Sequence, residues 1–234
     1  MMIYVMSDIH GEYEKYEAML KQIHFSDQDT LYVLGDVIDR GRDGLKTMLD
    51  MMQRPNVIAL IGNHEWMAAR CLPWLQREIT EEFLQQLQEE QIQALSLWLN
   101  NGAMTTIAEF QRLSDPQRTA VLDYMMDLIP YAIVLVDDRR YLLVHAGLGG
   151  FEPEKALTDY TLEELVWERP ALSTRYFDDD RSWVIVGHTP TLSISGKAEI
   201  CRGEQLIMID CGAVYPGGRL ACLCLDTMEV LYVG

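Results

Sequence analysis

The chain has 234 residues, 49% of them hydrophobic, and carries a net charge of −17 from 36 acidic and 19 basic residues. This length and apolar content suffice for one well-buried domain, and no linker or repeat divides the chain, so we expect a single domain over residues 1–234. The charge argues against a nucleic-acid partner, because nucleic-acid binding depends on many contacts from Lys and Arg to phosphates.

The sequence contains no segment typical of membrane insertion. Residues 1–6 lack a basic stretch followed by a long apolar run, and the apolar runs elsewhere are too short to span a bilayer. The five cysteines are odd in number and lack the spacing of a zinc finger, which suits small buried apolar groups in a reducing compartment. We therefore expect a cytoplasmic protein without membrane association and leave its oligomeric state open.

Five short runs rich in Val, Ile, Leu and Tyr are predicted to be strands buried on both faces. They cover residues 3–6, 31–34, 57–61, 141–144 and 183–186. Helical patterns with one apolar face follow the first two runs, over residues 13–23 and 45–52. Strands that alternate with helices predict an α/β sheet whose ligand site lies at the carboxyl ends of the strands.

Each predicted strand ends in a polar motif that contains histidine, aspartate or both. Four of the five histidines stand in these motifs, and the fifth, His24, is expected at the surface. One such motif alone is usually a loop or a satisfied core histidine, but their coincidence at five strand ends favours a catalytic metal site. The motifs are Ser7-Asp8-Ile9-His10-Gly11, Gly35-Asp36-Val37-Ile38-Asp39-Arg40-Gly41, Gly62-Asn63-His64-Glu65, His145-Ala146-Gly147 and Gly187-His188-Thr189-Pro190.

Three residues of the first two motifs predict the ligands of one divalent metal ion. Asp8 and His10 are two positions apart, which places their side chains on the same side of an extended strand exit. Together with Asp36 they offer a cation two carboxylates and one imidazole. This mixed set suits Mn, Fe or Zn better than Ca or Mg, and Mn is the metal that we expect.

The other motifs predict ligands for a second metal ion beside the first. Asn63, His145 and His188 can serve this ion, with Asp36 as the carboxylate that bridges both, since paired ions lie about 3.5–4 Å apart. Two divalent ions with only Asp8 and Asp36 as charged ligands would leave a charge of about +2. That charge would lower the pKa of a bound water and attract a phosphate dianion, in spite of the acidic chain.

Neighbouring residues in the same motifs fit catalytic and substrate-binding roles. His64 follows the predicted ligand Asn63 and is placed to donate a proton to a leaving-group oxygen, and Asp39 could hold its ring in the protonated form. Arg40 offers a planar guanidinium for phosphoryl oxygens. The alternative for Arg40 is an exposed arginine in a turn bounded by glycines.

These motifs resemble those of the calcineurin-like metallophosphoesterases, specifically the phosphoprotein-phosphatase family of Ser/Thr phosphatases and its small bacterial and phage branch. The similarity rests on residues 35–41 followed by residues 62–65, and it extends over nearly the whole chain. It implies a two-layered β-sandwich flanked by helices, and hydrolysis by a metal-bridging hydroxide without a phospho-enzyme. It also implies His64 as the acid and Asp39 as its orienting partner. The metal ligands that it implies are Asp8, His10, Asp36, Asn63, His145 and His188.

The resemblance nominates a second phosphate-binding arginine. In the small phage and bacterial members such an arginine follows a tryptophan by two residues, and Trp167-Glu168-Arg169 is similar to that element. The alternative for Arg169 is a solvated side chain before a proline. The sequence departs from the family pattern at Arg42, where Pro is expected, and at Cys211, where Thr is expected. An exposed Cys211 would make the site sensitive to oxidation.

A segment without metal-type motifs, residues 66–130, separates the third and fourth predicted strands. It is rich in helix formers, and Ser114 or Asp115 is predicted to cap a helix whose first turn contains Pro116. We predict a helical insert that covers the sheet, forms a cap over the substrate pocket, or does both. Residues 219–233 are predicted to form a hairpin that turns near residues 226–227, with two cysteines on one face.

Three functions compete for this sequence. The first is a phosphomonoesterase for proteins phosphorylated on Ser, Thr or Tyr. The second is a dinucleoside-polyphosphate hydrolase, which the similarity of residues 209–220 to bacterial enzymes of that kind favours. The third, an inactive scaffold for protein partners, would be expected to have lost some predicted ligands. Between Gln76 and Glu109 the chain has one Arg against six Glu, too few basic residues to follow a polyphosphate chain, so a phosphoprotein is the preferred substrate.

Overall fold

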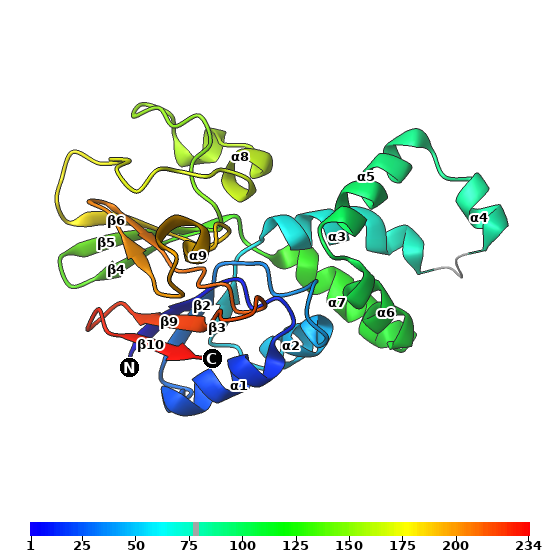
Figure 1. Cartoon of the computed structure of the whole chain (residues 1–234), viewed down its shortest axis with the longest axis horizontal. Coiled ribbons are helices and arrows are strands. Elements are labelled where there is room, and N and C mark those ends of the chain that lie inside the picture. The colour runs from blue at the N-terminus through cyan, green and yellow to red at the C-terminus, as the bar shows by residue number, and fades with distance from the viewer. Residues whose placement is uncertain (77–79) are drawn as a thin grey trace.

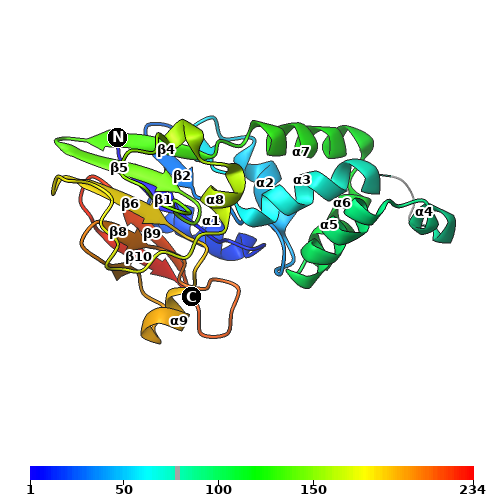
Figure 2. The same cartoon turned by 90° about the horizontal axis from the view of Figure 1, so that it is seen from above.

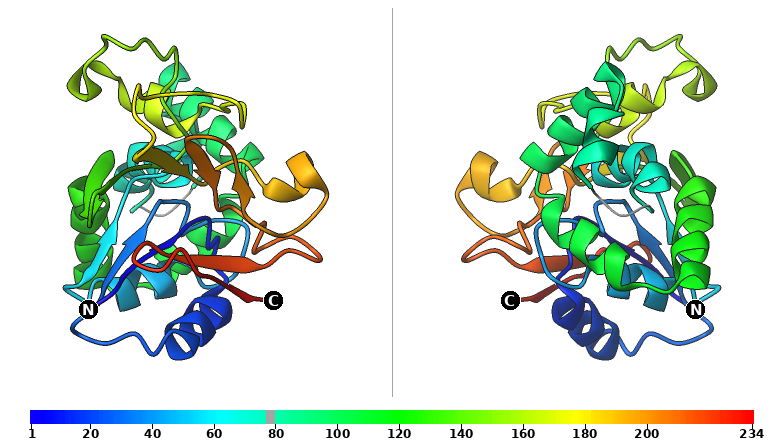
Figure 3. Two further views of the ribbon diagram at one scale, coloured as in Figure 1. Left: turned by 90° about the vertical axis from the view of Figure 1, so that its left-hand side faces the viewer. Right: turned by 90° about the vertical axis from the view of Figure 1, so that its right-hand side faces the viewer.

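Two mixed β-sheets packed face to face form the centre of the molecule, with helices on their outer sides (Figure 1). The structure, a computed structural model, describes residues 1–76 and 80–234. Figure 3 shows α1 below the sheet that contains the N-terminal strand, on the side away from the second sheet. The predicted α/β sandwich flanked by helices is confirmed.

The first sheet combines the N-terminal strands with the C-terminal hairpin, in the order β10-β9-β1-β2-β3. Its strands are β1 (Ile3–Met6), β2 (Thr30–Val33), β3 (Val57–Ala59), β9 (Leu220–Cys224) and β10 (Val230–Val233). Strands β1, β2 and β3 are parallel, so the polar motifs that follow them lie at one edge. The predicted hairpin is confirmed as β9–β10, and Cys222 and Cys224 both face the same core.

The second sheet has the order β4-β5-β6-β8-β7. Its strands are β4 (Tyr131–Val136), β5 (Arg139–Val144), β6 (Ser182–Val186), β7 (Cys201–Arg202) and β8 (Leu206–Met208). Strands β5, β6 and β8 are parallel, which brings the motifs after β5 and β6 to the same edge of this sheet. Strands β4, β7 and β8 have no counterpart among the predicted strands.

Both faces of the central strands are buried, as their continuous apolar sequences predict. In β1, Val5 lies in the core between the sheets together with Leu143 and Ile185 of the second sheet. Tyr4 and Met6 lie in the core formed with the helices. All five cysteines are buried and unpaired, as predicted.

The predicted amphipathic helices are confirmed as α1 (Tyr13–Gln22) and α2 (Gly44–Met51), which pack on the outer side of the first sheet. The second sheet carries η1 (Leu157–Asp159), α8 (Leu162–Val166) and α9 (Thr191–Ser195) in the segments that connect its strands. Within residues 1–76 and 80–234, no helix is long and apolar enough to cross a membrane.

The helical insert projects from the side of the sandwich (Figure 2). Its helices are α3 (Asn63–Leu75), α4 (Glu81–Gln85), α5 (Glu89–Asn100), α6 (Met104–Arg112) and α7 (Asp115–Asp127). Ser114 is the N-cap of α7, as predicted. The insert begins three residues earlier than predicted, because α3 already starts within the third polar motif. Arg77 lies outside the described residues.

Candidate active site

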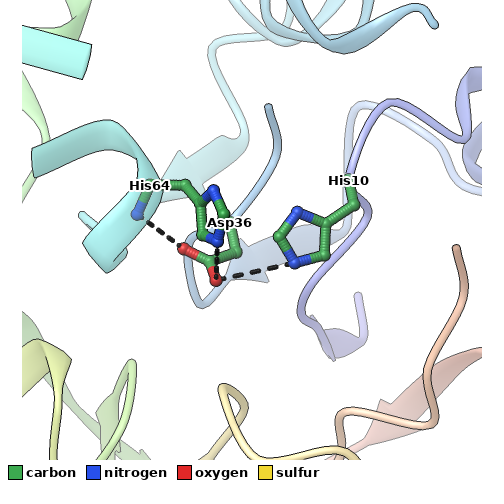
Figure 4. Close-up of side chains that lie close together, drawn as sticks. All are labelled: His10, Asp36 and His64. Carbon is green, nitrogen blue, oxygen red and sulfur yellow. Dashed lines mark hydrogen bonds and ion pairs between the residues drawn. The ribbon is translucent and has the colours of Figure 1, made fainter. Parts of the chain in front are cut away.

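The polar motifs of both sheets converge on the carboxylate of Asp36. Its Oδ1 accepts a hydrogen bond of 3.1 Å from the backbone N–H of His64, in the first turn of α3. Its Oδ2 lies 3.6 Å from Nε2 of His10, 3.8 Å from Nε2 of His64 and 3.5 Å from Nε2 of His145. Figure 4 shows the His10 and His64 rings reaching Asp36 from two different segments. All four side chains are buried, so these atoms face one another without bulk solvent.

Backbone carbonyls fix the orientation of two of these imidazole rings. The Nδ1 atom of His10 lies 2.9 Å from the carbonyl oxygen of Ile38, and that of His145 lies 2.7 Å from the carbonyl oxygen of Leu34. Since a carbonyl only accepts, each Nδ1 carries the proton, and each Nε2 lone pair faces Asp36. This arrangement is typical of histidines that bind metal ions.

Asn63, which follows β3 of the first sheet, contacts both histidines that follow strands of the second sheet. Asn63 Oδ1 lies 2.9 Å from His145 Nε2, and both atoms are acceptors in this tautomer. Two acceptors at this distance are stabilised by a shared cation. His188 Nδ1 lies 2.9 Å from the same Asn63 oxygen, while its buried Nε2 has no hydrogen-bond partner within residues 1–76 and 80–234. Asp36, His145 and His188 thus form one group that could hold a metal ion, and His10, Asp36 and His64 form another.

Asp8 lies beside these groups and belongs to neither of them. Its carboxylate accepts hydrogen bonds from the backbone N–H of His188 (2.9 Å to Oδ2) and from the Ser7 hydroxyl. The expectation that an extended exit aligns Asp8 with His10 is wrong, because both residues have a left-handed backbone, with φ of 52° and 46°. The segment turns sharply instead, and the Asp8 and His10 amides donate to the carbonyls of Gly35 and Asp36 in the exit of β2.

Left-handed backbone is concentrated at this site. Of nine non-glycine residues with positive φ among those described, six are predicted site residues: Asp8, His10, Asp36, Asp39, Arg40 and His188. Such conformations cost free energy and persist where the surrounding structure imposes them, typically at functional sites.

Glu65 imposes the conformation of the loop after β2. Its buried carboxylate accepts hydrogen bonds from the backbone N–H groups of Asp36 (2.8 Å), Val37 (2.8 Å), Ile38 (3.3 Å) and Gly62 (3.0 Å). Glu65 stands in the third sequence motif, where no role was predicted for it. One carboxylate therefore ties the exits of β2 and β3 together beneath Asp36.

Burial sets the protonation of the predicted ligands. It raises the pKa of Asp8 and, together with the nearby Asp8 carboxylate, raises that of Asp36 well above its usual range. Burial lowers the pKa of His10 well below its usual range and that of His188 to about 2. Burial thus favours the neutral form of these two imidazoles, which is the form that binds metal, and a cation would relieve the repulsion between the carboxylates. These residues fit a pair of divalent ions.

His64 and Asp39 form a buried pair beside this centre. His64 Nδ1 lies 2.6 Å from Asp39 Oδ2, in the geometry predicted for an acid and its orienting partner. Burial raises the pKa of Asp39 to about 7, against the lowering effect of hydrogen bonds from Thr106 and Trp98. Burial is the main cause that lowers the pKa of His64 well below its usual range, and the positive charge of Arg40 lowers it further. Burial and the Arg40 charge thus favour the neutral His64 ring, whereas the acid role predicted from the sequence needs a protonated one.

Two predicted arginines lie at the opening of the site. Arg40 donates to Nε2 of His10 (2.7 Å) and to Nε2 of His64 (3.1 Å), and its guanidinium lies 5.7 Å from the centre of the Tyr215 ring. The exposed Arg169 donates to the Thr189 hydroxyl at 3.1 Å, next to His188. Both guanidinium groups are thus beside the histidine cluster.

The structure also places Trp167, the tryptophan two residues before Arg169, and Cys211, the cysteine at a position where Thr is expected. The Trp167 ring packs edge-on against the His188 ring, with 5.8 Å between centres, so the tryptophan before Arg169 supports a predicted ligand. Cys211 is buried, and burial raises the pKa of its thiol to about 12, so the oxidation expected of an exposed Cys211 does not apply. The unforeseen buried carboxylate of Asp210 also lies near Asp8, whose charge adds to burial in raising the Asp210 pKa.

Known proteins resemble this chain over most of its length. The sequence profile of calcineurin-like phosphoesterases matches residues 1–210. The chain is 29% identical to serine/threonine-protein phosphatase 2 of Escherichia coli (strain K12) over 154 residues, 64% of this chain and 60% of that protein. It is 28% identical to the symmetrical bis(5'-nucleosyl)-tetraphosphatase of Erwinia tasmaniensis over 116 residues, 48% of this chain and 42% of that protein. The matches thus span less than two thirds of these curated relatives.

Solved structures share the fold at low sequence identity. A crystal structure of a proposed diadenosine tetraphosphatase superposes with a TM-score of 0.64 at 18% identity, covering 99% of this chain and 92% of that one. A protein serine/threonine phosphatase from Saccharomyces cerevisiae gives 0.60 at 13% identity, covering 99% and 78%. A metallophosphoesterase from Sphaerobacter thermophilus gives 0.56 at 19% identity, covering 100% and 88%. At such identities these similarities describe the fold alone.

Proposed function

Because the chain belongs to the calcineurin-like phosphoesterase family, we propose that it is a metal-dependent phosphomonoesterase that acts on phosphorylated Ser and Thr residues of proteins. The observation that carries this proposal is the pair of buried imidazole nitrogens, from His10 and His145, that lie 3.6 and 3.5 Å from Oδ2 of Asp36. Two imidazoles that approach one carboxylate from different sheets suit divalent metal ions, and the calcineurin-like phosphoesterase family uses a pair of such ions.

Six residues would hold the two ions. Asp36 is the bridging carboxylate in this proposal, because its Oδ2 faces histidines from both sheets. When bound, two divalent ions, with Mn as the expected metal, polarise a phosphoryl group and lower the pKa of a water molecule. The residues proposed to hold them are Asp8, His10, Asp36, Asn63, His145 and His188.

His64 is the proposed general acid. Asp39 Oδ2 accepts from its Nδ1 and leaves Nε2 facing the centre of the site. A bound phosphate dianion would favour protonation of this Nε2, against the burial and the Arg40 charge that keep the ring neutral in this structure. The proton would pass from Nε2 to the leaving oxygen as the P–O bond breaks, giving an alcohol and inorganic phosphate.

Arg40 and Arg169 are the proposed clamp for the phosphoryl oxygens. Arg40 now donates to the His10 nitrogen that a metal ion would use. With His10 Nε2 as a metal ligand, the Arg40 guanidinium would be free to bind the substrate, while Tyr215 supports the guanidinium from one side. Arg169 lies at the exposed rim, where a phosphoryl group bound to the ions can be reached.

The choice of a phosphoprotein rests on charge. A phosphomonoester has its negative charge at the reacting phosphorus, where the ions and both arginines can neutralise it. A dinucleoside polyphosphate would also need cations further away, and residues 76–109 contain one Arg against six Glu. The Escherichia coli relative supports the same choice.

Hydrolysis of dinucleoside polyphosphates is the second candidate, since the Erwinia tasmaniensis relative is a symmetrical bis(5'-nucleosyl)-tetraphosphatase. A substrate panel separates the two. We expect the Mn-loaded protein to show a higher kcat/KM on phosphoserine and phosphothreonine peptides than on diadenosine tetraphosphate. A preference of about tenfold or more for the dinucleotide (1.4 kcal/mol) would reject the first proposal and support the second. Absence of turnover on every phosphoester would reject both and support an inactive scaffold.

A further inference from the structure

The side chain of Asp39 is held by two residues of the helical insert. We call residues 98–109, the end of α5, the following turn and most of α6, the insert root. Trp98 Nε1 donates to Asp39 Oδ2 at 2.7 Å, and Thr106 Oγ1 donates to Asp39 Oδ1 at 2.5 Å. Asp39, Trp98 and Thr106 are all fully buried. The insert thus contacts the partner of His64 rather than only covering the sheet.

These bonds determine the direction in which the carboxylate points. Oδ2 bonds both His64 and Trp98, and Oδ1 bonds Thr106, so the two oxygens cannot exchange places without breaking a buried hydrogen bond. The Thr106 oxygen also accepts from the Asp39 amide at 2.9 Å, which fixes the left-handed backbone of that residue. A fully buried carboxylate that loses one of these partners is left with an unsatisfied oxygen, which costs free energy.

Helix α5 contributes little else to the core. Among its residues, all of which are described, Trp98 is the only one that is buried. Its indole N–H would cost free energy if it were buried without an acceptor, and Asp39 supplies that acceptor. The turn after α5 also contacts Arg40, the residue after Asp39. The Gly102 carbonyl in this turn accepts a hydrogen bond of 3.1 Å from the Arg40 amide.

We propose that Trp98 and Thr106 are positioning residues for the general acid: they hold the Asp39 carboxylate so that the His64 ring keeps Nε2 aimed at the leaving-group oxygen. The proposal rests on the proposed function. It gives the insert a role besides the two that the sequence predicted, covering the sheet and capping the substrate pocket, since the root supports the catalytic pair through contacts to Asp39 and Arg40.

The kinetic test uses two esters that differ in their need for an acid. Trp98→Phe keeps the ring and removes the N–H, and Thr106→Val keeps the shape and removes the hydroxyl. We expect kcat on an alkyl phosphate such as a phosphoserine peptide to fall by about 10- to 100-fold, with KM nearly unchanged. The loss on p-nitrophenyl phosphate should be clearly smaller, because its leaving group departs without a proton. Thr106→Ser should restore the alkyl-ester activity.

Matched controls come from the same region. Thr105→Val is the same change one residue earlier, at a hydroxyl without a hydrogen-bond partner among the described residues, and Trp74→Phe removes an indole N–H that donates to the Arg70 carbonyl instead. Both should leave the ratio of the two activities unchanged. The proposal would be overturned if Trp98→Phe and Thr106→Val lost the same factor on both esters. It would also be overturned if the control variants showed the same selective loss on the alkyl ester as the root variants.

A second readout does not depend on turnover. In the metal-free protein, the His64 Nδ1 proton should give a downfield proton NMR signal, identified by its loss in His64→Asn. We expect Trp98→Phe and Thr106→Val to shift or broaden this signal, and Thr105→Val to leave it unchanged. An unchanged signal in both root variants would reject the positioning role. If the wild-type protein hydrolyses no phosphoester, the proposed function fails, and this signal still decides whether the insert root orients His64.

Discussion

The strand-end loops carry the groups that face Asp36 Oδ2, whereas the insert root carries groups that touch Asp39 and Arg40 and never reach the centre. The insert itself is divided further. We call residues 80–92 the insert tip, and their side chains with described exposure are exposed or half-buried, with Ile92 51% exposed. We therefore expect substitutions in the strand-end loops to reduce turnover most, substitutions in the insert root to reduce it less, and substitutions in the insert tip to change it least.

The largest effect should come from the centre of the loops. Asp36→Asn should lose both metal ions together and at least about 10³-fold in turnover, because the bridging charge serves each ion. Metal content by mass spectrometry and turnover on p-nitrophenyl phosphate measure this, and chelation of the wild-type protein should abolish turnover until Mn is added back. Asp137→Asn, at an exposed turn, is the control. Two ions retained in an active Asp36→Asn protein would contradict the bridging role.

A smaller and more selective loss should follow removal of the acid. His64→Asn should keep its metal ions and lose about 10²–10⁴-fold in turnover on a phosphoserine peptide, with a clearly smaller loss on p-nitrophenyl phosphate. His24→Ala, at an exposed histidine, should change neither rate. If both esters lost the same factor, His64 would not be the proton donor.

A root residue away from Asp39 should affect stability rather than chemistry. Glu109 accepts hydrogen bonds from the amides of Gly44 (3.0 Å) and Leu45 (3.1 Å) at the start of α2, and burial raises its pKa from 4.5 to about 7. A raised carboxyl pKa stabilises the fold below the unfolded value and loses that contribution as the pH rises through the folded value. Wild-type stability should therefore fall relative to Glu109→Gln between pH 4.5 and pH 7.

Urea midpoints at several pH values for both proteins measure this difference. The remaining acidic residues are the same in the two proteins, so their effects cancel in the comparison. A difference that stays constant from pH 5 to pH 8 would show that Glu109 is charged throughout, held so by the amides of α2.

The smallest effect is expected at the tip. Ile92→Asn lies on the same helix as Trp98, six residues earlier, and should change stability by less than about 0.5 kcal/mol. Its turnover on both esters should equal that of the wild type. A selective loss on diadenosine tetraphosphate in this variant would assign the tip to a nucleotide-binding surface and favour the second candidate function.

The sequence could predict what is encoded locally. His10, Asp36 and His64 follow apolar runs whose parallel pairing in the first sheet brings them to one edge. His145 and His188 follow runs that pair in the second sheet, and the packing of the two sheets joins both groups. The hairpin at the C-terminus and the Ser114 cap are likewise short-range patterns.

The insert root could not be predicted in this way. Thr106 is 67 residues from Asp39 and Trp98 is 59 residues from it, and neither belongs to a motif. In the sequence both look like ordinary residues of amphipathic helices, and only the packing of α5 and α6 against the loop after β2 gives them a polar partner. The Asp8–His10 geometry was missed for a related reason, since alternation predicts an extended backbone and cannot reveal a left-handed one.

The bond from His145 to the Leu34 carbonyl joins the two sheets, and the Asp8 carboxylate accepts from an amide 180 residues further along the chain. Contacts between such distant positions form late in folding, because the cost of closing a long loop precedes the gain from the contact. A chain that has folded only β1, β2 and β3 holds Asp36 and His64 but lacks His145 and His188, which follow β5 and β6. During synthesis, therefore, the groups that face Asp36 come together only after β5 and β6 have emerged and the two sheets have docked.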